Sequence, residues 1–218
     1  MIDLHTHSLL SDGALLPCEL ARRAQTKGYK VIGITDHVGP SNIEFVIESV
    51  LRACKDINSN WQIKAIPGIE LTHMPIESLK GAVKFARSKG IKLVLIHGET
   101  IVECVIPGTN KAAILAGPDI LTHPGLISID DARLAASRGV CLEVTARKGH
   151  SLTNGHVAKV ASLTGVKLVL NTDSHAPEDL ITKDFAEKVL SGAGLKKKEI
   201  NEVFKNSKEL ARRLLELK

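Results

Sequence analysis

Cysteine is scarce in this sequence, and no apolar run is long. The 218 residues include four cysteines, which lie far apart and form no CxxC pair: Cys18, Cys54, Cys104 and Cys141. Their spacing excludes a disulfide framework or a cysteine-ligated zinc site and is typical of thiols in a reducing compartment. No apolar run approaches the roughly 20 residues of a membrane helix, and no basic-then-apolar leader opens the sequence. We therefore expect a cytoplasmic protein without a membrane partner.

Aromatic residues make up only 3% of the chain, while the net charge is +5. Much of the positive charge lies near the C-terminus, in LKKKE, KNSK and ARRLLELK. This charge predicts a solvated helix face, although an acidic partner or a nucleic acid would also fit. Few aromatic side chains are available to stack on bases, which disfavours a nucleic-acid partner. A small anionic substrate fits the charge equally well.

The chain does contain a repeated unit in which a helix-like stretch ends at glycine and an apolar strand follows. The clearest copies are TKGYKVIGITDH, SKGIKLVLIHG, SRGVCLEVTA and LTGVKLVLNTDSH, with glycine at positions 28, 90, 139 and 165. Glycine suits the left-handed conformation at a helix C-terminus. The strands are rich in valine, isoleucine and leucine, as in parallel strands covered on both faces. Three further strands are predicted at IDLHTH, around 62–71 and around 118–125.

Seven strands alternating with helices predict a single α/β domain over residues 1–218. Strand starts recur every 21 to 32 residues, the size of a strand–helix unit. Such units build either an open doubly wound sheet or a closed barrel. No GxGxxG motif follows the first strand, which disfavours a dinucleotide-binding sheet. We expect a barrel with a final helix over residues 197–217.

Metal-ligating side chains cluster where the predicted strands end. Six of the nine histidines lie at such an end or just after it: His5, His7, His37, His97, His123 and His175. Glu70 and Asp173 also end strands, and Asp12 follows the first strand. Because side chains alternate along a strand, Asp3, His5 and His7 share one face. Parallel barrels build their active sites at this C-terminal rim, so we expect these ligands to meet there.

Histidine and carboxylate ligands without cysteine suit zinc, manganese or iron. Nine ligands exceed what one ion takes, and at about four per ion they predict two or three ions. Two ions about 3.5–4 Å apart can activate water against a phosphate ester and stabilise the leaving oxygen. The residues alone therefore predict metal-assisted hydrolysis.

Six ordered motifs carry a resemblance to a known family. DLHTHS, ITDH, GIE, IHG, THPG and NTDSH resemble the motifs of the PHP (polymerase and histidinol phosphatase) superfamily, and they run from Asp3 to His175. The resemblance implies a distorted (β/α)7 barrel with two or three metal ions at its C-terminal rim. It also implies a stand-alone, histidinol-phosphatase-like phosphoesterase in which metal-bound water attacks the phosphate.

The resemblance further implies three metal sites. Their ligands would be His5, His7, Glu70 and Asp173 in the first; Glu70 as a bridge with His97 and His123 in the second; and Asp12, His37 and His175 in the third. Position 12 is a histidine in some relatives, and an aspartate there remains a usable oxygen ligand. Asp3 and Asp36 would orient imidazoles from outside the metal sites, although a loop or helix-cap hydrogen bond fits Asp36 equally well.

Substrate contacts are predicted from the loop after the sixth strand. Arg147 offers a fork of donors for phosphate, and Lys148 and His150 are further candidates. His73 either reaches the mouth, as a candidate catalytic group, or lies in an exposed loop. His156 is predicted to lie within a helix and to be structural.

The segment 98–111 is longer than a barrel loop requires, so it is a candidate for substrate selection. Its residues Gly108, Thr109 and Asn110 either begin a helix with free amides facing an anion or form an ordinary capped loop.

Three functions are compatible with the sequence. The favoured one is hydrolysis of a phosphomonoester such as histidinol phosphate, with a small phosphorylated molecule as the partner. The alternative is a phosphodiesterase or 3′-5′ exonuclease acting on nucleic acid or nucleotides. A noncatalytic PHP-like subunit of a larger complex is the third, and the nine intact ligands disfavour it.

Overall fold

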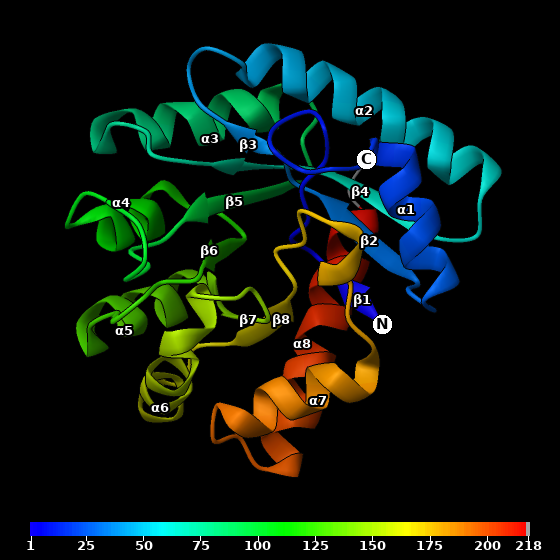
Figure 1. Ribbon diagram of the computed structural model, residues 1–218. Helices are drawn as coiled ribbons and strands as arrows, with labels where there is room; N and C mark the ends of the chain where they lie inside the picture. The colour runs from blue at the N-terminus through cyan, green and yellow to red at the C-terminus, as the bar shows by residue number, and fades with distance from the viewer. Residues whose placement is uncertain (217–218) are drawn as a thin grey trace.

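Seven parallel strands form a sheet that curls into a nearly closed barrel (Figure 1). The computed structural model describes residues 1–216. Neighbouring strands follow in chain order: β1 (Ile2–Asp3), β2 (Val31–Ile34), β4 (Lys64–Leu71), β5 (Leu93–His97), β6 (Ile120–Thr122), β7 (Cys141–Thr145) and β8 (Leu168–Asn171). A further short strand, β3 (His37–Val38), pairs with the end of β4. The predicted (β/α)7 barrel is confirmed, and β3 is an addition that the sequence did not predict.

The segments that follow β1 and β8 meet and close the barrel. The backbone N–H of His7 donates to the Ser174 carbonyl at 2.8 Å, and the N–H of Asp173 donates to the His5 carbonyl at 3.0 Å. A parallel bridge also pairs Thr6 with Ser174. Closure of the barrel therefore joins two segments that both carry predicted ligands.

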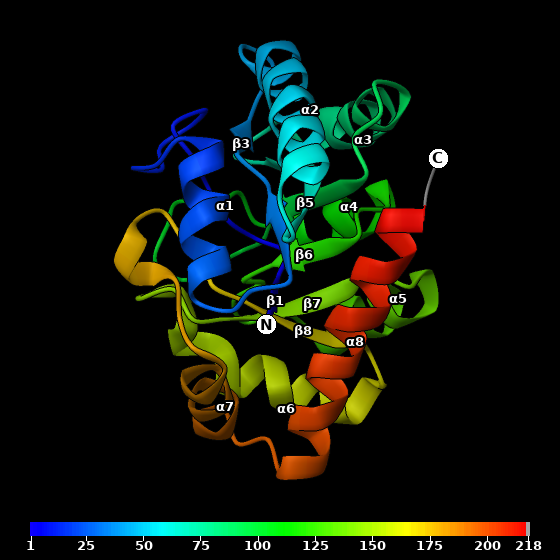
Figure 2. The same ribbon diagram turned by 90° about the vertical axis from the view of Figure 1, so that its right-hand side faces the viewer.

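Helices surround the barrel (Figures 1 and 2). They are α1 (Pro17–Thr26), α2 (Ile43–Asn60), α3 (Leu79–Ser88), α4 (Thr109–Ala116), α5 (Ile129–Arg138), α6 (Asn154–Thr164), α7 (Lys183–Gly192) and α8 (Lys197–Glu216). The four glycines expected at helix ends all have positive φ, between 70° and 94°. The final helix begins where it was predicted, and residue 217 lies outside the described residues. None of the helices within residues 1–216 combines the length and apolar character that crossing a bilayer requires.

The interior of the barrel is apolar at the end where the strands begin. It is filled by Leu4, Val31, Ile66, Leu93, Leu95, Ile120, Cys141, Val169, Leu210, Ala211 and Leu214. The last three belong to α8, which lies behind β1 and β8 in Figure 1. The Asn206 side-chain amide donates to the carbonyl of Leu168 at 3.0 Å, at the start of β8. Helix α8 therefore closes the N-terminal end of the barrel.

Inward-facing side chains change from apolar to polar along each strand. From the start of β8 onward, the alternating residues are Val169, Asn171 and Asp173, and all three are buried. In β5 the same alternation leads from Leu95 to His97. Because every strand points the same way, this gradient concentrates the polar side chains at one end of the barrel, the C-terminal rim.

The closing role of α8 gives a prediction for stability. Leu214 is 1% exposed within the interior layer, so Leu214→Ala should lower the free energy of unfolding by about 2–5 kcal/mol through lost burial and the cavity left behind. Denaturant-induced unfolding measures the change. The neighbouring Leu215 is 36% exposed, and Leu215→Ala should change stability by only about 0.5 kcal/mol. Equal losses in the two variants would contradict the role of α8.

Candidate metal centre

The strand ends bring the nine predicted ligands to one mouth. The most deeply placed are His5, His7, Glu70, His97, His123 and Asp173, each no more than 3% exposed. Asp12, His37 and His175 lie nearer the solvent. The ligand atoms fall into groups within 4.8 Å of one another, among them His5, His7 and Glu70, and His5, His123 and Asp173. Every member of these two groups was predicted from the sequence as a ligand.

The Nε2 atom of His5 lies at the centre of the buried groups. It is 2.9 Å from His7 Nε2, 3.4 Å from Glu70 Oε1 and 3.5 Å from Asp173 Oδ1. On the other side of the ring, Nδ1 lies 2.8 Å from the Glu143 carboxylate and donates to it. The neutral His5 ring therefore carries its proton on Nδ1 and turns a lone pair toward the carboxylate oxygens of Glu70 and Asp173, which are themselves acceptors. This geometry fits a metal ion, since a cation between the acceptors removes their mutual repulsion.

Glu143 is a residue that the sequence reading missed. Besides holding His5, its carboxylate accepts a hydrogen bond from the Asn171 side chain at 2.8 Å and from the His123 N–H at 3.0 Å. It lies in β7, a strand that holds none of the nine predicted ligands. A carboxylate inside the otherwise buried strand CLEVT was the available signal, because burying an unpaired charge is costly.

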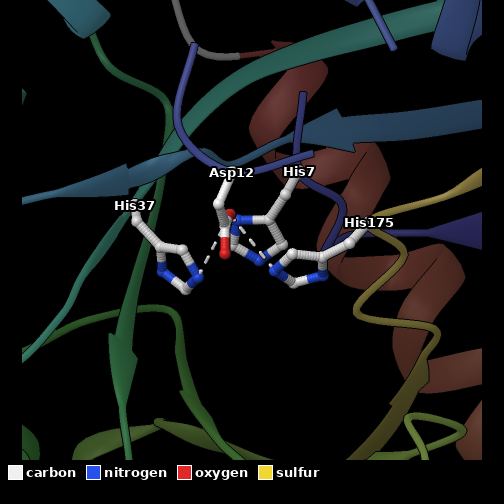
Figure 3. Close-up of side chains that lie close together, drawn as sticks. All are labelled: His7, Asp12, His37 and His175. Carbon is white, nitrogen blue, oxygen red and sulfur yellow. Dashed lines mark ion pairs between the residues drawn. The ribbon is translucent and has the colours of Figure 1, made fainter. Parts of the chain in front are cut away.

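The outer group consists of His7, Asp12, His37 and His175, which point toward one another in Figure 3. Asp12 Oδ1 lies 3.3 Å from His175 Nε2 and 3.6 Å from His37 Nε2. The His175 Nδ1 donates to the Asp173 carbonyl at 2.9 Å. That bond turns the Nε2 lone pair toward Asp12. The three ligands that the resemblance groups in one site are thus neighbours, with His7 beside them.

His97 and His123 differ in their surroundings. His123 Nε2 is 3.6 Å from Glu70 Oε1, as the shared site implies. His97 donates from Nδ1 to the Gly98 carbonyl at 3.1 Å, and its Nε2 lies 3.1 Å from Glu103 Oε2. Glu103, in the loop after β5, is a second residue that the sequence reading missed.

Burial and neighbouring charges move the pKa values of the buried ligands in opposite directions. Burial lowers the pKa of His5, but the carboxylates of Glu143 and Glu70 outweigh it and hold that pKa well above its usual value. Burial, with the nearby imidazoles, holds the pKa of His7 well below its usual value. Burial raises the pKa of Asp173 to about 6. Without a metal ion, neighbouring ligands therefore favour different protonation states. A bound cation would favour neutral imidazoles and ionised carboxylates throughout the group.

Unpaired atoms and backbone strain also mark this mouth. Among the described residues, the buried atoms without a hydrogen-bond partner include Nδ1 of His7, Nδ1 of His123 and Oδ1 of Asp173. The non-glycine residues with positive φ within residues 1–216 are His73 (49°), His123 (24°) and Asp173 (52°). Such strain persists where the surrounding structure enforces it, and it gathers at functional sites.

The Asp3 carboxylate does not bind an imidazole as expected, and Asp36 makes the loop hydrogen bonds that were its alternative role. The Asp3 carboxylate accepts from the Thr172 hydroxyl at 2.6 Å and from the N–H groups of Thr172 and His5. Asp36 accepts from Ser8, through both its N–H and its hydroxyl, and from the Ser11 hydroxyl. Both carboxylates therefore hold the backbone that carries the ligands, because short aspartate side chains reach nearby N–H and hydroxyl groups first.

A cavity of about 550 Å³ opens above the ligands and contains several of the predicted substrate contacts. Arg147, His150 and His73 line it, whereas Lys148 is exposed and outside the lining. The Arg147 guanidinium lies 3.4 Å from both the Asp173 carbonyl and the Asp179 carboxylate. Arg147 thus lines the cavity with its guanidinium next to the Asp179 carboxylate.

Of the two readings of residues 108–110, the structure supports the capped one and not the anion site. Helix α4 does begin at Thr109, but the Glu99 carboxylate accepts from the N–H groups of Gly108 and Asn110 at 2.9 and 2.8 Å. The chain's own carboxylate thus takes the amides that an anion would need. His156 lies in α6, as predicted, with Nε2 2.8 Å from the Ile127 carbonyl.

Comparison with known proteins finds relatives of this chain in several organisms. Residues 3–97 match the PHP domain model. An uncharacterized protein of Methanocaldococcus jannaschii is 44% identical over 215 residues, covering 97% of this chain and 99% of that protein. A probable phosphatase of Shewanella sp. is 31% identical, covering 80% and 76%. A DNA polymerase/3′-5′ exonuclease of Bacillus subtilis is 30% identical over 82% of this chain, which spans only 35% of that protein.

Solved structures share the fold at low identity. A chain in archaeal ribonuclease P with mature tRNA aligns with a TM-score of 0.72 and 18% identity, covering 98% of this chain and 91% of that chain. A Listeria monocytogenes protein proposed to be a histidinol phosphatase aligns with a TM-score of 0.61 and 11% identity, covering 86% and 99%. At these identities the likeness shows the barrel alone.

The contact between Glu143 and His5 gives a prediction for metal affinity. Glu143→Gln removes the charge that fixes the His5 tautomer while keeping the side-chain size, so zinc affinity at the buried groups should fall by about 10–100-fold. Competition with a chromophoric chelator measures it. Glu19 lies on α1, where it pairs only with Arg23 on the helix surface, and Glu19→Gln is the control. Unchanged affinity in Glu143→Gln would show that His5 does not need this partner.

Proposed function

The chain belongs to the PHP family of metal-dependent phosphoesterases, and from that premise we propose that it hydrolyses a small phosphomonoester, such as histidinol phosphate, with two or three divalent metal ions. A hydrolase acting on phosphate esters follows from the family. Similarity to a probable phosphatase, which covers 76% of that protein's length, supports phosphatase activity for this chain. The number of ions follows from the nine proposed ligands, which gather at one mouth.

The observation that carries this proposal is the convergence of acceptor atoms around His5 Nε2. With Nδ1 donating to Glu143, the neutral His5 ring presents its Nε2 lone pair to Glu70 and Asp173, where a metal ion would take the place of a second proton on the ring. We assign the buried ligands, His7 among them, to the first two ions, and we assign Asp12, His37 and His175 of Figure 3 to the third. Zinc, manganese or iron suits this mixture of imidazole and carboxylate. Bound ions would supply a Lewis acid for the phosphate and lower the pKa of attacking water.

Arg147 supports a small phosphorylated substrate. Among the described residues that line the cavity, it is the single lysine or arginine. Its planar guanidinium can pair with two phosphate oxygens and stabilise charge that develops toward the leaving oxygen. A polynucleotide would need several such contacts along its backbone. One guanidinium at a mouth of this size favours one phosphate group.

Phosphodiester hydrolysis on nucleic acid or nucleotides is the second candidate, supported by similarity to the polymerase/exonuclease. The basic C-terminal segment does not strengthen it. Its helix, α8, packs where the strands begin, and Arg213 pairs with Asp119 at 2.8 Å there, at the end of the barrel away from the mouth. A noncatalytic role rests on fold likeness alone and conflicts with the intact ligand set.

We also propose a reducing, cytoplasmic location. All four cysteines are free thiols, and Cys54 and Cys141 are buried. Burial raises the pKa of Cys141 to about 11, which keeps this thiol unreactive. These cysteines add nothing to the mouth.

A phosphate-release screen tests the proposed reaction. Metal-loaded protein should release phosphate from one or more phosphomonoesters faster than it cleaves dinucleotides or short oligonucleotides. Asp173→Ala and His97→Ala should each lower turnover by at least about 100-fold, since water activation and phosphate polarisation depend on the ions. Asp130 is a 90% exposed aspartate on α5, and Asp130→Ala should retain full activity. Preferred cleavage of oligonucleotides would instead support the nuclease alternative.

Arg147 should affect substrate binding without affecting metal content. Arg147→Ala should lower kcat/KM by about 10–100-fold and weaken inhibition by phosphate, the scale of a lost charge-assisted hydrogen-bond pair. Arg147→Lys should recover only part of the loss, because it keeps the charge but not the planar fork. The exposed neighbour gives the matched control, Lys148→Ala. If Arg147→Ala retains both parameters, another cation binds the phosphate.

A further inference from the structure

A second cavity, which we name the side pocket, lies beside the mouth. It has a volume of about 300 Å³. His73 and His97 line both the side pocket and the cavity above the predicted ligands, so these two side chains form the border between them. The other walls of the side pocket are mostly apolar and include Leu71, Met74, Leu79, Ile96, Val105 and Ile106.

The ends of β4 and β5 supply side chains to both cavities. Glu70 and His97 belong to the candidate metal centre, whereas their neighbours in sequence, Leu71 and Ile96, line the side pocket. Because successive side chains of a strand point to opposite faces, the same strand ends provide metal ligands on one side and apolar surface on the other. The side pocket therefore begins directly behind the proposed ligands.

The loop after β5 changes from polar to apolar where it passes from one cavity to the other. Glu103 lines the mouth, and the next three residues, Cys104, Val105 and Ile106, line the side pocket. The Ile106 side chain is 56% exposed, so a ligand in the side pocket could cover apolar surface that water now contacts. This loop lies in the segment 98–111, whose length predicted a part in substrate selection.

The side pocket offers few partners to a polar group. Among the described residues, no lysine, arginine, aspartate or glutamate lines it. Thr109 also lines it, but the Thr109 hydroxyl donates to the Ile106 carbonyl at 2.6 Å. A polar group buried without a hydrogen-bond partner is costly, whereas removal of an apolar group from water is favourable. The side pocket therefore favours an apolar ligand group.

The loop that covers the side pocket is held by contacts outside it. The Glu99 carboxylate accepts from the N–H groups of Gly108 and Asn110 at 2.9 and 2.8 Å. The neighbouring loop packs so closely that a Cβ on Gly125 would lie 1.7 Å from the Glu99 carbonyl oxygen. A wall that is already ordered lowers the entropic cost of binding a ligand.

We propose that the side pocket binds the alcohol part of the substrate, and that the substrate is a phosphomonoester of an alcohol with a small apolar or aromatic group. His97 links the two sites, because it is a proposed ligand of the ion shared with Glu70 and His123 and also a wall of the side pocket. A phosphate in the mouth and an apolar group in the side pocket would therefore be neighbours.

The size of the side pocket sets the size of this group. An apolar cavity of about 150 Å³ is enough to bind benzene. The side pocket, at about 300 Å³, therefore has room for one ring or a short branched chain. The inference rests on the proposed phosphatase function and narrows its substrate class.

A series of straight-chain alkyl phosphates tests the side pocket. With metal-loaded protein, kcat/KM should rise by about 3- to 4-fold for each CH2 group added from methyl to butyl phosphate, the factor that burial of one CH2 group supplies. The leaving alcohols have nearly the same acidity, so the chemical step is comparable along the series. Equal kcat/KM values for all members would overturn the proposal.

A charge placed in the side pocket should abolish this preference. The ratio of kcat/KM for butyl phosphate to that for methyl phosphate should fall by about 10-fold in Ile106→Asp, because the carboxylate opposes burial of the alkyl chain. Ile101 lies in the same loop, is 53% exposed and lines neither cavity, so Ile101→Asp is the matched control and should keep the wild-type ratio. Any partial loss of metal or of folded protein cancels in the ratio. The same ratio in all three proteins would contradict the assignment.

Alkylation of Cys104 tests the side pocket without turnover. Cys104 is an exposed thiol in the lining, so butylphosphonate, which is not hydrolysed, should slow its reaction with iodoacetamide more than methylphosphonate does. Cys18, a half-buried thiol on α1, is the internal control and should react at the same rate with either compound. Equal rates for Cys104 with the two phosphonates overturn the inference.

The two measurements separate failure of this inference from failure of the proposed function. If no alkyl phosphate is hydrolysed but butylphosphonate protects Cys104, the proposed reaction fails and the side pocket stands. If alkyl phosphates are hydrolysed at equal rates and Cys104 is not protected, only this inference fails.

Discussion

The pairing of the barrel's first and last segments is the constraint on which the candidate metal centre depends. Two backbone hydrogen bonds between 5–7 and 173–174 bring Asp173 beside His5 and His7. All three side chains are buried, and because burying polar groups is costly, their own interactions do not assemble them. The apolar barrel wall and the backbone ladder hold them in place, which is why the ligands can be preorganised before any ion binds.

The apolar interior and the polar mouth are two ends of the same strands. Leu93 and Leu95 fill the interior, and His97 follows on the same face of β5. Helix α8 covers the interior from the opposite end and contributes Leu210 and Leu214. Burial below the mouth thus offsets the cost of gathering unpaired polar groups above it. The candidate metal ligands and the apolar residues of the interior thus lie at opposite ends of the barrel axis.

The positions of the ligands could be predicted from the sequence, whereas the contacts that orient them could not. Histidines at strand ends indicate a common rim because parallel strands all end at one edge. The direction of a side chain depends on partners far along the chain: Glu143 holds His5 across 138 residues. The same limit explains why Asp3 binds Thr172 and nearby backbone N–H groups instead of an imidazole and why Glu103 was missed. A loop carboxylate gives no periodic signal, and its partners become visible only in three dimensions.

The closure of the barrel also governs when the protein can fold during its synthesis. Asp3 and Thr172, which bond to each other at the junction, are 169 residues apart in the chain. The first strand therefore leaves the ribosome long before residues 172–174 are synthesised. Until then, His5 and His7 lack their contacts with Asp173, and His5 lacks its contact with Glu143. Helix α8 follows still later, so the interior stays open to water until that helix has emerged. Loading of the proposed metal sites would thus be a late event, and a stalled chain would expose both the open apolar interior and the unpaired imidazoles to chaperones and proteases.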